Sequence, residues 1–248
     1  MRVAIPVQLS ILVAEKRLYK EYQLFLYLKY LSDSKVVLCK SKFKMLELLL
    51  KVNEATIRKY LVRLLGRNWI GYDSNANLYI VRGFKEVMKM EGLKSQLIAR
   101  LSFDDLVNIK AIIGVSIFGH CYRNSKYKIH KKNWKKKKDR GRGRLKKEGP
   151  KQRSHPSYYP VSIGGVENLI HVSMSNICRL KKKAIEAGLL DAKHCLIPID
   201  LPRSEWNYII KYKFPTKGKY VVKSKKLYLS LPDLVKPQIA LVRSHHLK

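Results

Sequence analysis

An internal repeat, offset by 120 residues, constrains the fold of this 248-residue chain more than any other feature. The segments from Val52 to Lys59 and from Val172 to Arg179 align without a gap. Each begins with an apolar residue, continues with a residue that favours a helix N-cap (Asn53 or Ser173) and runs on with the spacing of an amphipathic helix. The side chain of the capping residue can accept a hydrogen bond from a first-turn amide, so both segments predict a helix with a defined start.

Both predicted helices also end in the same way. Asn68 in the first copy and Gly188 in the second tolerate the left-handed backbone that ends many helices, and an apolar pair then predicts the start of a strand. Upstream, residues 43–50 and 163–170 predict a shorter helix with a glutamate at the same position of each copy. A short helix, a tight turn and a capped second helix together predict a helix-turn-helix motif.

The residues around the first copy extend this pattern. Residues 15–31 have an apolar face with helical spacing, and residues 36–39 predict a small strand. Two further strands, 69–72 and 78–81, flank the polar turn at 73–77. The order of helix, strand, helix, turn, helix and hairpin resembles the winged-helix family. This resemblance implies a domain in which the second helix of the helix-turn-helix is presented to the major groove of DNA.

The second copy resembles the same family. Residues 103–123 predict its leading helix, with Ser102 and Asp105 forming a capping box at its start. Residues 158–161 predict its first strand.

The wing of the second copy departs from the pattern. Its expected strands, residues 189–199 and 220–229, are separated by residues 200–219. Within this insertion, the alternation in residues 208–214 predicts an ordinary strand, in preference to a platform on which RNA bases stack.

These assignments predict an α+β protein, mainly α, with two tandem winged-helix domains and an inserted basic flexible arm. The opening residues lack a signal-peptide cleavage pattern and no apolar run approaches membrane-spanning length, so we expect a packed N-terminal segment. The predicted boundaries are an N-terminal segment (1–14), winged-helix domain 1 (15–83), a connecting helix (84–101), and winged-helix domain 2 (102–248), which contains the disordered basic arm (124–157).

Composition indicates a polyanionic partner. The chain has 52 Lys and Arg against 18 Asp and Glu, a net charge of +34, while 46% hydrophobic residues suffice to build cores. A folded chain with this charge is expected to bind nucleic acid. Its four cysteines lack the short paired spacing of a disulfide framework, which indicates a reducing compartment.

The charge is concentrated in the basic arm. Residues 126–153 hold fifteen Lys or Arg against two acidic residues and few apolar ones, so they cannot build a core. The alternation of Arg and Gly from Arg140 to Arg144 resembles the core of AT-hook arms, which lie in a narrow minor groove. Phosphate contact, RNA contact, a solvated spacer and a nuclear targeting signal are the other interpretations. The candidate DNA contacts of the arm are Lys135, Lys136, Lys137, Lys138, Arg140, Arg142 and Arg144.

Helical spacing identifies the outward residues of the first capped helix. Arg58 and Lys59 are candidates for base or phosphate contact, because Arg can pair with guanine through two hydrogen bonds. Asn75 and Asn77 in the predicted wing would contact the DNA backbone or only form the turn. The candidate DNA-binding residues of this helix are Thr56, Arg58, Lys59 and Arg63.

The second capped helix has a more basic outward face. Asn176 would read adenine or bond its own backbone, and Lys181 to Lys183 are expected to contact phosphate. If one helix alone reads sequence, we expect this one, which also lies beside the arm. Its candidate DNA-binding residues are Ser175, Asn176, Arg179, Lys182 and Lys183.

Catalytic and metal-binding patterns are weak. The chain has no glycine-rich phosphate loop, and its acidic residues are scattered. His120-Cys121 and His194-Cys195 repeat a ligand-like dipeptide but lack the short Cys-x-x-Cys spacing typical of zinc sites. We therefore expect a non-enzymatic protein with no cofactor and no metal.

The sequence thus predicts a sequence-specific protein that binds double-stranded DNA, with a second copy of the chain as a candidate partner and no membrane association. The two-domain layout resembles plasmid-type replication initiators, which carry paired winged helices; transcription regulation and a recombination accessory role stay open. The expected location is the nucleoid in the cytoplasm, or the nucleus of a eukaryote. The alternatives are an RNA-binding or ribonucleoprotein component, a nuclease or recombinase, and a first domain that docks protein through Tyr60, Val62 and Trp69.

Overall fold

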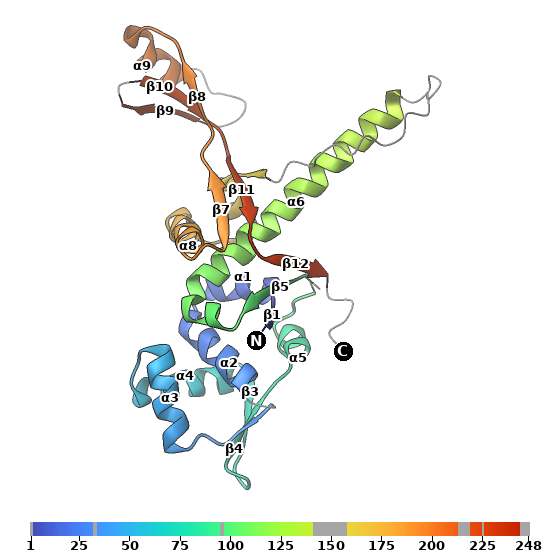
Figure 1. Ribbon diagram of the computed structural model, residues 1–248, viewed down its shortest axis with the longest axis vertical. Helices are drawn as coiled ribbons and strands as arrows, with labels where there is room; N and C mark the ends of the chain where they lie inside the picture. The colour runs from blue at the N-terminus through green and yellow to red at the C-terminus, as the bar shows by residue number, and fades with distance from the viewer. Residues whose placement is uncertain are drawn as a thin grey trace.

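The protein is a mainly helical α+β structure with small antiparallel sheets (Figure 1). Its hydrophobic core is continuous and includes buried residues from both halves of the chain. The computed structural model describes residues 2–31, 34–94, 97–140, 158–212, 219–224 and 226–243.

The first half contains a unit that we call the N-terminal repeat. Its sheet has the strand order β2-β4-β3 and is antiparallel throughout. Trp69, which follows its last helix, is fully buried against the rings of Tyr22 and Phe25. The unit consists of α2 (Tyr19–Leu31), β2 (Lys35–Val36), α3 (Lys40–Leu50), α4 (Glu54–Gly66), β3 (Ile70–Asp73) and β4 (Leu78–Val81).

The second half contains a unit with the same order of elements, the C-terminal repeat. Its sheet has the order β6-β11-β7, so the strand after the leading helix again pairs with the last strand of the unit. The internal repeat seen in the sequence is therefore also a repeat of topology. The unit consists of α6 (Ile109–Arg140), β6 (Tyr159–Val161), α7 (Ile163–Ile170), α8 (Met174–Glu186), β7 (Leu190–Lys193) and β11 (Asp233–Pro237).

A third sheet joins the two halves. β5 (Leu97–Ser102) lies at its centre and pairs with β1 (Arg2–Pro6) on one side and β12 (Ala240–Arg243) on the other. The predicted connecting helix over residues 84–101 is therefore wrong in its second half: only α5 (Phe84–Met90) is helical. The apolar residues of β5 find partners near both ends of the chain, which local spacing does not reveal.

The N-terminal segment is packed, as expected, but its helix boundary differs from the prediction. α1 (Val7–Lys16) ends at Arg17, which has a left-handed backbone (φ 56°), before α2 begins. Residues 15–31, which were predicted to form one helix, therefore belong to two helices, α1 and α2. Tyr30 of α2 fixes β1, because its hydroxyl donates to the Ala4 carbonyl oxygen at 2.6 Å.

Helix α6 crosses the middle of the molecule, and two glycines allow its neighbours to approach. A Cβ atom on Gly114 would lie 2.3 Å from the carbonyl oxygen of Leu180 in α8, and one on Gly119 would lie 2.4 Å from a methyl carbon of Leu241 in β12. A short 3-10 helix, η1 (Asp104–Asn108), precedes α6 where a continuous α-helix was predicted. The Asp105 carboxylate accepts the Ser102 amide at 2.8 Å, which is one half of the predicted capping box; the Ser102 hydroxyl donates to Asp104 and caps no amide.

The first part of the basic arm was expected to be disordered, but it is helical. Helix α6 continues through this part of the arm and ends at residue 140. The first part of this stretch lies along β6: Ser125 Oγ donates to the Pro160 carbonyl oxygen at 2.9 Å, and His130 Nε2 lies 3.3 Å from the Tyr159 hydroxyl. Beyond this support, lysine is a good helix former, and a helix that is already nucleated extends at little cost. Residues 141–157 of the predicted arm lie outside the described residues.

The segment predicted to form the second wing is a long two-stranded ribbon with a small unit at its tip (Figure 1). β8 (Leu196–Ile199) and β10 (Lys226–Ser230) continue the pairing of β7 with β11, and β9 (Lys219–Lys223) extends the outer sheet. The strand predicted over residues 208–214 is wrong, because α9 (Arg203–Tyr212) occupies most of that segment. Helical geometry buries Ile209 and stacks the Arg203 guanidinium 5.6 Å from the Trp206 ring centre.

Replacing Gly114 by alanine should destabilise the fold, because the added methyl group would overlap the backbone of α8. We expect the free energy of unfolding in urea to fall by about 1–3 kcal/mol, the range for an overpacked core. The matched change Gly164→Ala places a methyl group in open space within α7 and should leave stability unchanged or slightly raised. Equal stability of Gly114→Ala and wild type would contradict the close crossing.

Candidate nucleic-acid interface

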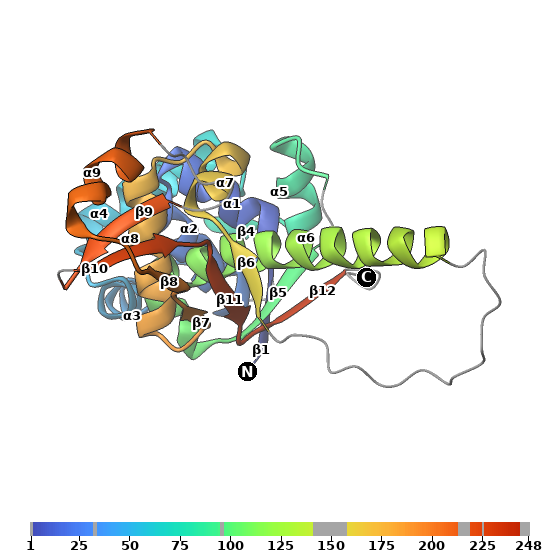
Figure 2. The same ribbon diagram turned by 90° about the horizontal axis from the view of Figure 1, so that it is seen from above.

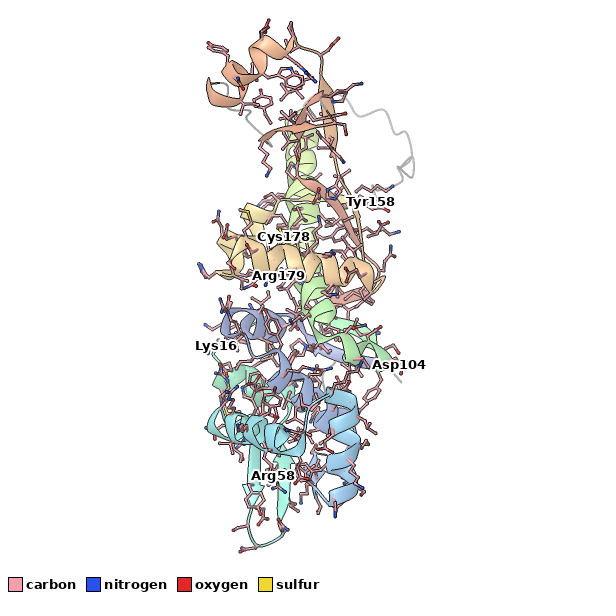
Figure 3. All side chains as sticks on the ribbon, turned by 90° about the vertical axis from the view of Figure 1, so that its left-hand side faces the viewer. Lys16, Arg58, Asp104, Tyr158, Cys178 and Arg179 are labelled. Atoms are coloured by element: carbon pink, nitrogen blue, oxygen red, sulfur yellow. The ribbon has the colours of Figure 1, made fainter. Side chains whose placement is uncertain are left out.

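Helices α4 and α8 lie on the same side of the elongated molecule (Figure 3). Both run across its long axis, and Arg58 on α4 and Arg179 on α8 are labelled there. Each is the third helix of its repeat and follows a tight turn whose first residue, Lys51 or His171, has a left-handed backbone. The two repeats therefore expose equivalent helices on one surface.

The start of α4 is held by two side chains. Asn53 Oδ1 accepts the Thr56 amide at 3.0 Å, as the N-cap prediction requires. Glu47 of α3 adds a second acceptor, since its Oε1 accepts the Glu54 amide at 2.6 Å. Together they satisfy two of the amides that a helix start leaves without partners.

The start of α8 is held differently from the prediction. Ser173 occupies the N-cap position, but its side chain makes no capping hydrogen bond. Instead, Glu167 Oε1 accepts the Met174 amide at 3.1 Å, the same contact that Glu47 makes in the first copy. The aligned glutamates are therefore the shared helix-start contact of both copies, and their common register in the sequence is the signal that identifies them.

The ends of α4 and α8 confirm the two residues that were expected to have a left-handed backbone. Asn68 has φ 57° and Gly188 has φ 68°. Their amides bond to the Leu65 and Ile185 carbonyl oxygens, and each following amide reaches one residue further back along its helix. Asn68 and Gly188 thus reverse the chain into β3 and β7 at equivalent points.

The outward face of α4 is largely engaged with its own protein. Thr56 Oγ1 donates to Asn53 Oδ1 at 2.6 Å, and Arg58 donates to Glu54 Oε1 while its guanidinium lies 4.6 Å from the Phe43 ring centre. Arg63 donates to Oε1 of the buried Glu21 at 2.5 Å. Lys59 is exposed and makes no hydrogen bond or ion pair among the described residues.

The outward face of α8 has fewer intramolecular partners. Arg179 is exposed and has no ion pair to any described residue, whereas Lys182 and Lys183 share the exposed Glu186 at 3.9 and 2.7 Å. Ser175 is exposed and Asn176 is half-buried. Four predicted residues therefore project from this helix, and Asn176 lies at its edge.

The expectation for Lys181 is wrong. Its side chain is buried, with 8% exposed, and donates to Asp233 at the start of β11. His194 approaches the other oxygen of the same carboxylate at 2.7 Å. Lys181 therefore fixes α8 to the base of the ribbon and is not available to a partner.

A cluster of lysines at the junction of the repeats was not predicted, since its members come from three distant segments. Lys20, Lys110 and Lys183 line a hollow of about 390 Å³ between α2, the start of α6 and the end of α8, with Glu186 also on its wall. Burial lowers the pKa of Lys20, and the nearby charges of Lys110 and Lys51 lower it further. The cluster places three lysines beside the end of α8.

The basic end of α6 points away from the surface that bears α4 and α8 (Figure 2). The helix has 32 residues, about 48 Å at 1.5 Å per residue. Lys135, Lys136, Lys137, Lys138 and Arg140 lie on its final turns, whereas Arg142 and Arg144 lie outside the described residues. The described part of the arm, residues 124–140, is thus not beside the outward face of α8, although α8 packs against the first half of α6.

Other predicted surface residues have structural partners. Asn75 donates its amide to Asp73 Oδ1, and Asn77 accepts from the Tyr72 hydroxyl with a left-handed backbone, so both form the turn between β3 and β4. Of the residues proposed for protein docking, Trp69 is fully buried and Val62 is 67% exposed.

Within the described part of the chain, no three His, Cys, Asp or Glu residues are arranged to hold a metal ion. The four cysteines are free thiols. No helix in the described ranges is both long and apolar enough to cross a membrane.

Comparisons with known proteins give no relative. No protein-family profile matches the chain, and no curated protein and no solved structure is significantly similar to it.

Removing the Glu167 carboxylate should weaken the start of α8, because the Ser173 side chain makes no capping hydrogen bond that could replace it. We expect Glu167→Ala to lower the free energy of unfolding by about 1 kcal/mol, as for loss of a helix cap. Thermal and urea unfolding would measure this loss. Glu186→Ala, at the other end of the same helix, should leave stability unchanged; equal losses in the two variants would contradict the role of Glu167.

Proposed function

We propose that the two repeats are winged-helix domains and that the protein binds double-stranded DNA through α4 and α8. The observation that carries this proposal is the pair of equivalent helices, built by the same local contacts and exposed on one side of a strongly basic molecule. A recognition helix in a winged helix occupies this position and inserts into the major groove. Two such helices on one face match two successive segments of groove on one duplex.

The second helix is the better candidate for reading sequence. Arg179 projects without an intramolecular ion pair among the described residues, so its guanidinium can pair with guanine without losing an existing contact. Arg58 and Arg63 of α4 would first have to leave Glu54 and the buried Glu21. α4 therefore contributes mainly position and phosphate contact, with Lys59 as its most available cation.

The lysine cluster at the junction of the repeats, which we call the junction lysines, fits this arrangement of two helices on one duplex. If α4 and α8 enter two segments of groove, the sugar-phosphate backbone passes between them, and Lys20, Lys110 and Lys183 beside the end of α8 are candidates to contact it. Phosphate contacts set the register of a protein on DNA and carry most of the salt-dependent affinity.

The distal half of α6 supports contact with further phosphates. Residues 126–140 include nine Lys or Arg and one Asp, and many of the cations lie three or four positions apart on the helix. Such like-charged pairs repel each other, and a polyanion relieves the repulsion. Because the helix projects to the other side, it would reach a bent or second DNA segment.

The biological role follows from the resemblance of this layout to plasmid-type replication initiators, and we propose origin binding by a non-enzymatic protein. Transcription regulation and recombination use the same DNA contact and are distinguished by where the protein binds in a genome. The RNA alternative would use the folded domains as spacers and the basic arm as the RNA contact, and the aromatic residues proposed for base stacking lie partly on α9, where residues 208–212 are helical. Competition of duplex DNA against structured RNA for the protein separates these two functions.

The substitution Arg179→Gln should reduce affinity for the cognate duplex by about 1–3 kcal/mol and relax preference at one base pair, because one bidentate contact is lost. Lys59→Gln should have a smaller, sequence-independent effect. Lys85→Gln on α5, which removes the same charge from an exposed site outside α4 and α8, is the control. Fluorescence anisotropy with matched and scrambled duplexes measures all three; equal effects of Arg179→Gln and Lys85→Gln would contradict base reading by α8.

Duplex binding should depend steeply on salt. With roughly eight phosphate contacts, the binding constant should fall with about the seventh power of the salt concentration, because each contact releases condensed counterions. A titration series from low to high salt measures this slope. A flat response would exclude phosphate contact as the main source of affinity.

A further inference from the structure

A second hollow, remote from α4 and α8, lies between α6 and the chain that leads from β11 into β12. Its volume is about 520 Å³, within the range of small-molecule sites. Figure 2 shows β12 running beside α6 on the side to which the helix projects. The hollow therefore opens on a different part of the molecule from the surface proposed for duplex DNA.

One wall of the hollow is cationic. Arg123, Lys126 and His130 of α6 line it, and none of the described residues around it is acidic. The Arg123 guanidinium is held at the rim, because its Nη1 donates to the Leu241 carbonyl oxygen at 3.2 Å. Lys126 is exposed. A wall with this composition favours an anionic group.

The remaining walls are aromatic and apolar. Tyr122 and Tyr127, the latter with 66% of its surface exposed, line the hollow from α6, and Ile239 and Leu241 line it from the chain that leads into β12. The Tyr122 ring is fixed edge-on against Tyr159 of β6, with 5.1 Å between ring centres. A flat ring placed against Tyr127 would thus lie within reach of the cationic wall.

We propose that this hollow binds a nucleotide unit, with the base against Tyr127 and the apolar wall and the phosphate at Arg123 and Lys126. Proteins that hold single strands combine stacking aromatic side chains with cations that follow the backbone. The unit is supplied by a single-stranded nucleic acid or by a free nucleotide. The basic turns of α6 continue from this site, so a single strand would extend along them. The proposal does not depend on duplex binding by α4 and α8.

The test uses the full-length protein and two double variants from the same turn of α6. Lys126→Gln with Tyr127→Ala alters the hollow, whereas Lys128→Gln with Ile129→Ala removes the same charge and an exposed apolar group outside it. The probe is a fluorescein-labelled oligothymidylate of twelve nucleotides, followed by anisotropy. Circular dichroism checks that both variants keep their helix content.

We expect the first pair to weaken oligothymidylate binding about tenfold more than the control pair, because base stacking is lost as well as charge. Tyr127→Phe should keep wild-type affinity, since stacking needs the ring and not the hydroxyl group. If millimolar adenosine monophosphate displaces the oligothymidylate, a free nucleotide is sufficient to occupy the hollow. If it does not, the ligand is a single strand. Equal weakening by the two pairs, or no binding of either probe by the wild type, would overturn the proposal.

Duplex binding is measured in parallel on the same variants. The two pairs should bind the duplex equally, because they remove the same charge. If the wild type fails to bind duplex but binds oligothymidylate at this site, the proposed function fails while the nucleotide site stands.

Discussion

The close crossing of α6 and α8 at Gly114 is the contact on which the other parts of the structure depend. Without a side chain at that position, the backbone of α8 packs directly on α6, and Lys181 then reaches Asp233 at the base of the ribbon. Gly119 allows β12 to approach the same helix, and β12 completes the sheet with β5 and β1. One helix therefore sets the position of the second repeat, the long ribbon and the sheet that pairs β5 with strands near both ends of the chain.

The two repeats share a scaffold but differ in electrostatics. Glu47 and Glu167 make the same helix-start contact, and Asn68 and Gly188 make the same exit. On the exposed faces, however, both arginines of α4 are paired with glutamates, while Arg179 of α8 is not paired with any described residue. Since an existing ion pair must be broken before an arginine can bind a base, the proposed complex with DNA would use α4 for position and α8 for reading.

The positive charge is distributed over surfaces that face different directions. The outward face of α8 and the junction lysines lie along one side, and the distal turns of α6 lie on the other. Helix α6 directs the second surface away from the first, so a single duplex would have to bend, or a second strand be present, for both surfaces to be occupied. This geometry connects the proposed duplex interface with the proposed nucleotide site at the root of the projecting helix.

The sequence by itself determined the features that depend on local spacing. The repeat, the left-handed residues at Asn68 and Gly188, the Asn53 cap and the outward positions of Arg179 and Lys59 all follow from periodicity and from residues that favour one backbone conformation. Local patterns also misled: the alternation in residues 208–214 fits a strand, but the burial of Ile209 at the ribbon tip selects a helix. The lysine run after residue 124 suggests disorder, yet support from β6 carries the helix onward.

Only the tertiary structure decided which charged groups have partners. Arg63 with Glu21, Lys181 with Asp233, and the Lys20 cluster join segments that lie between 42 and 163 positions apart in the chain. The pairing of β5 with both ends of the chain is equally hidden from the sequence. An ion pair or a strand pair forms between groups that packing brings close together in space. The spacing of residues along the chain does not predict that distance.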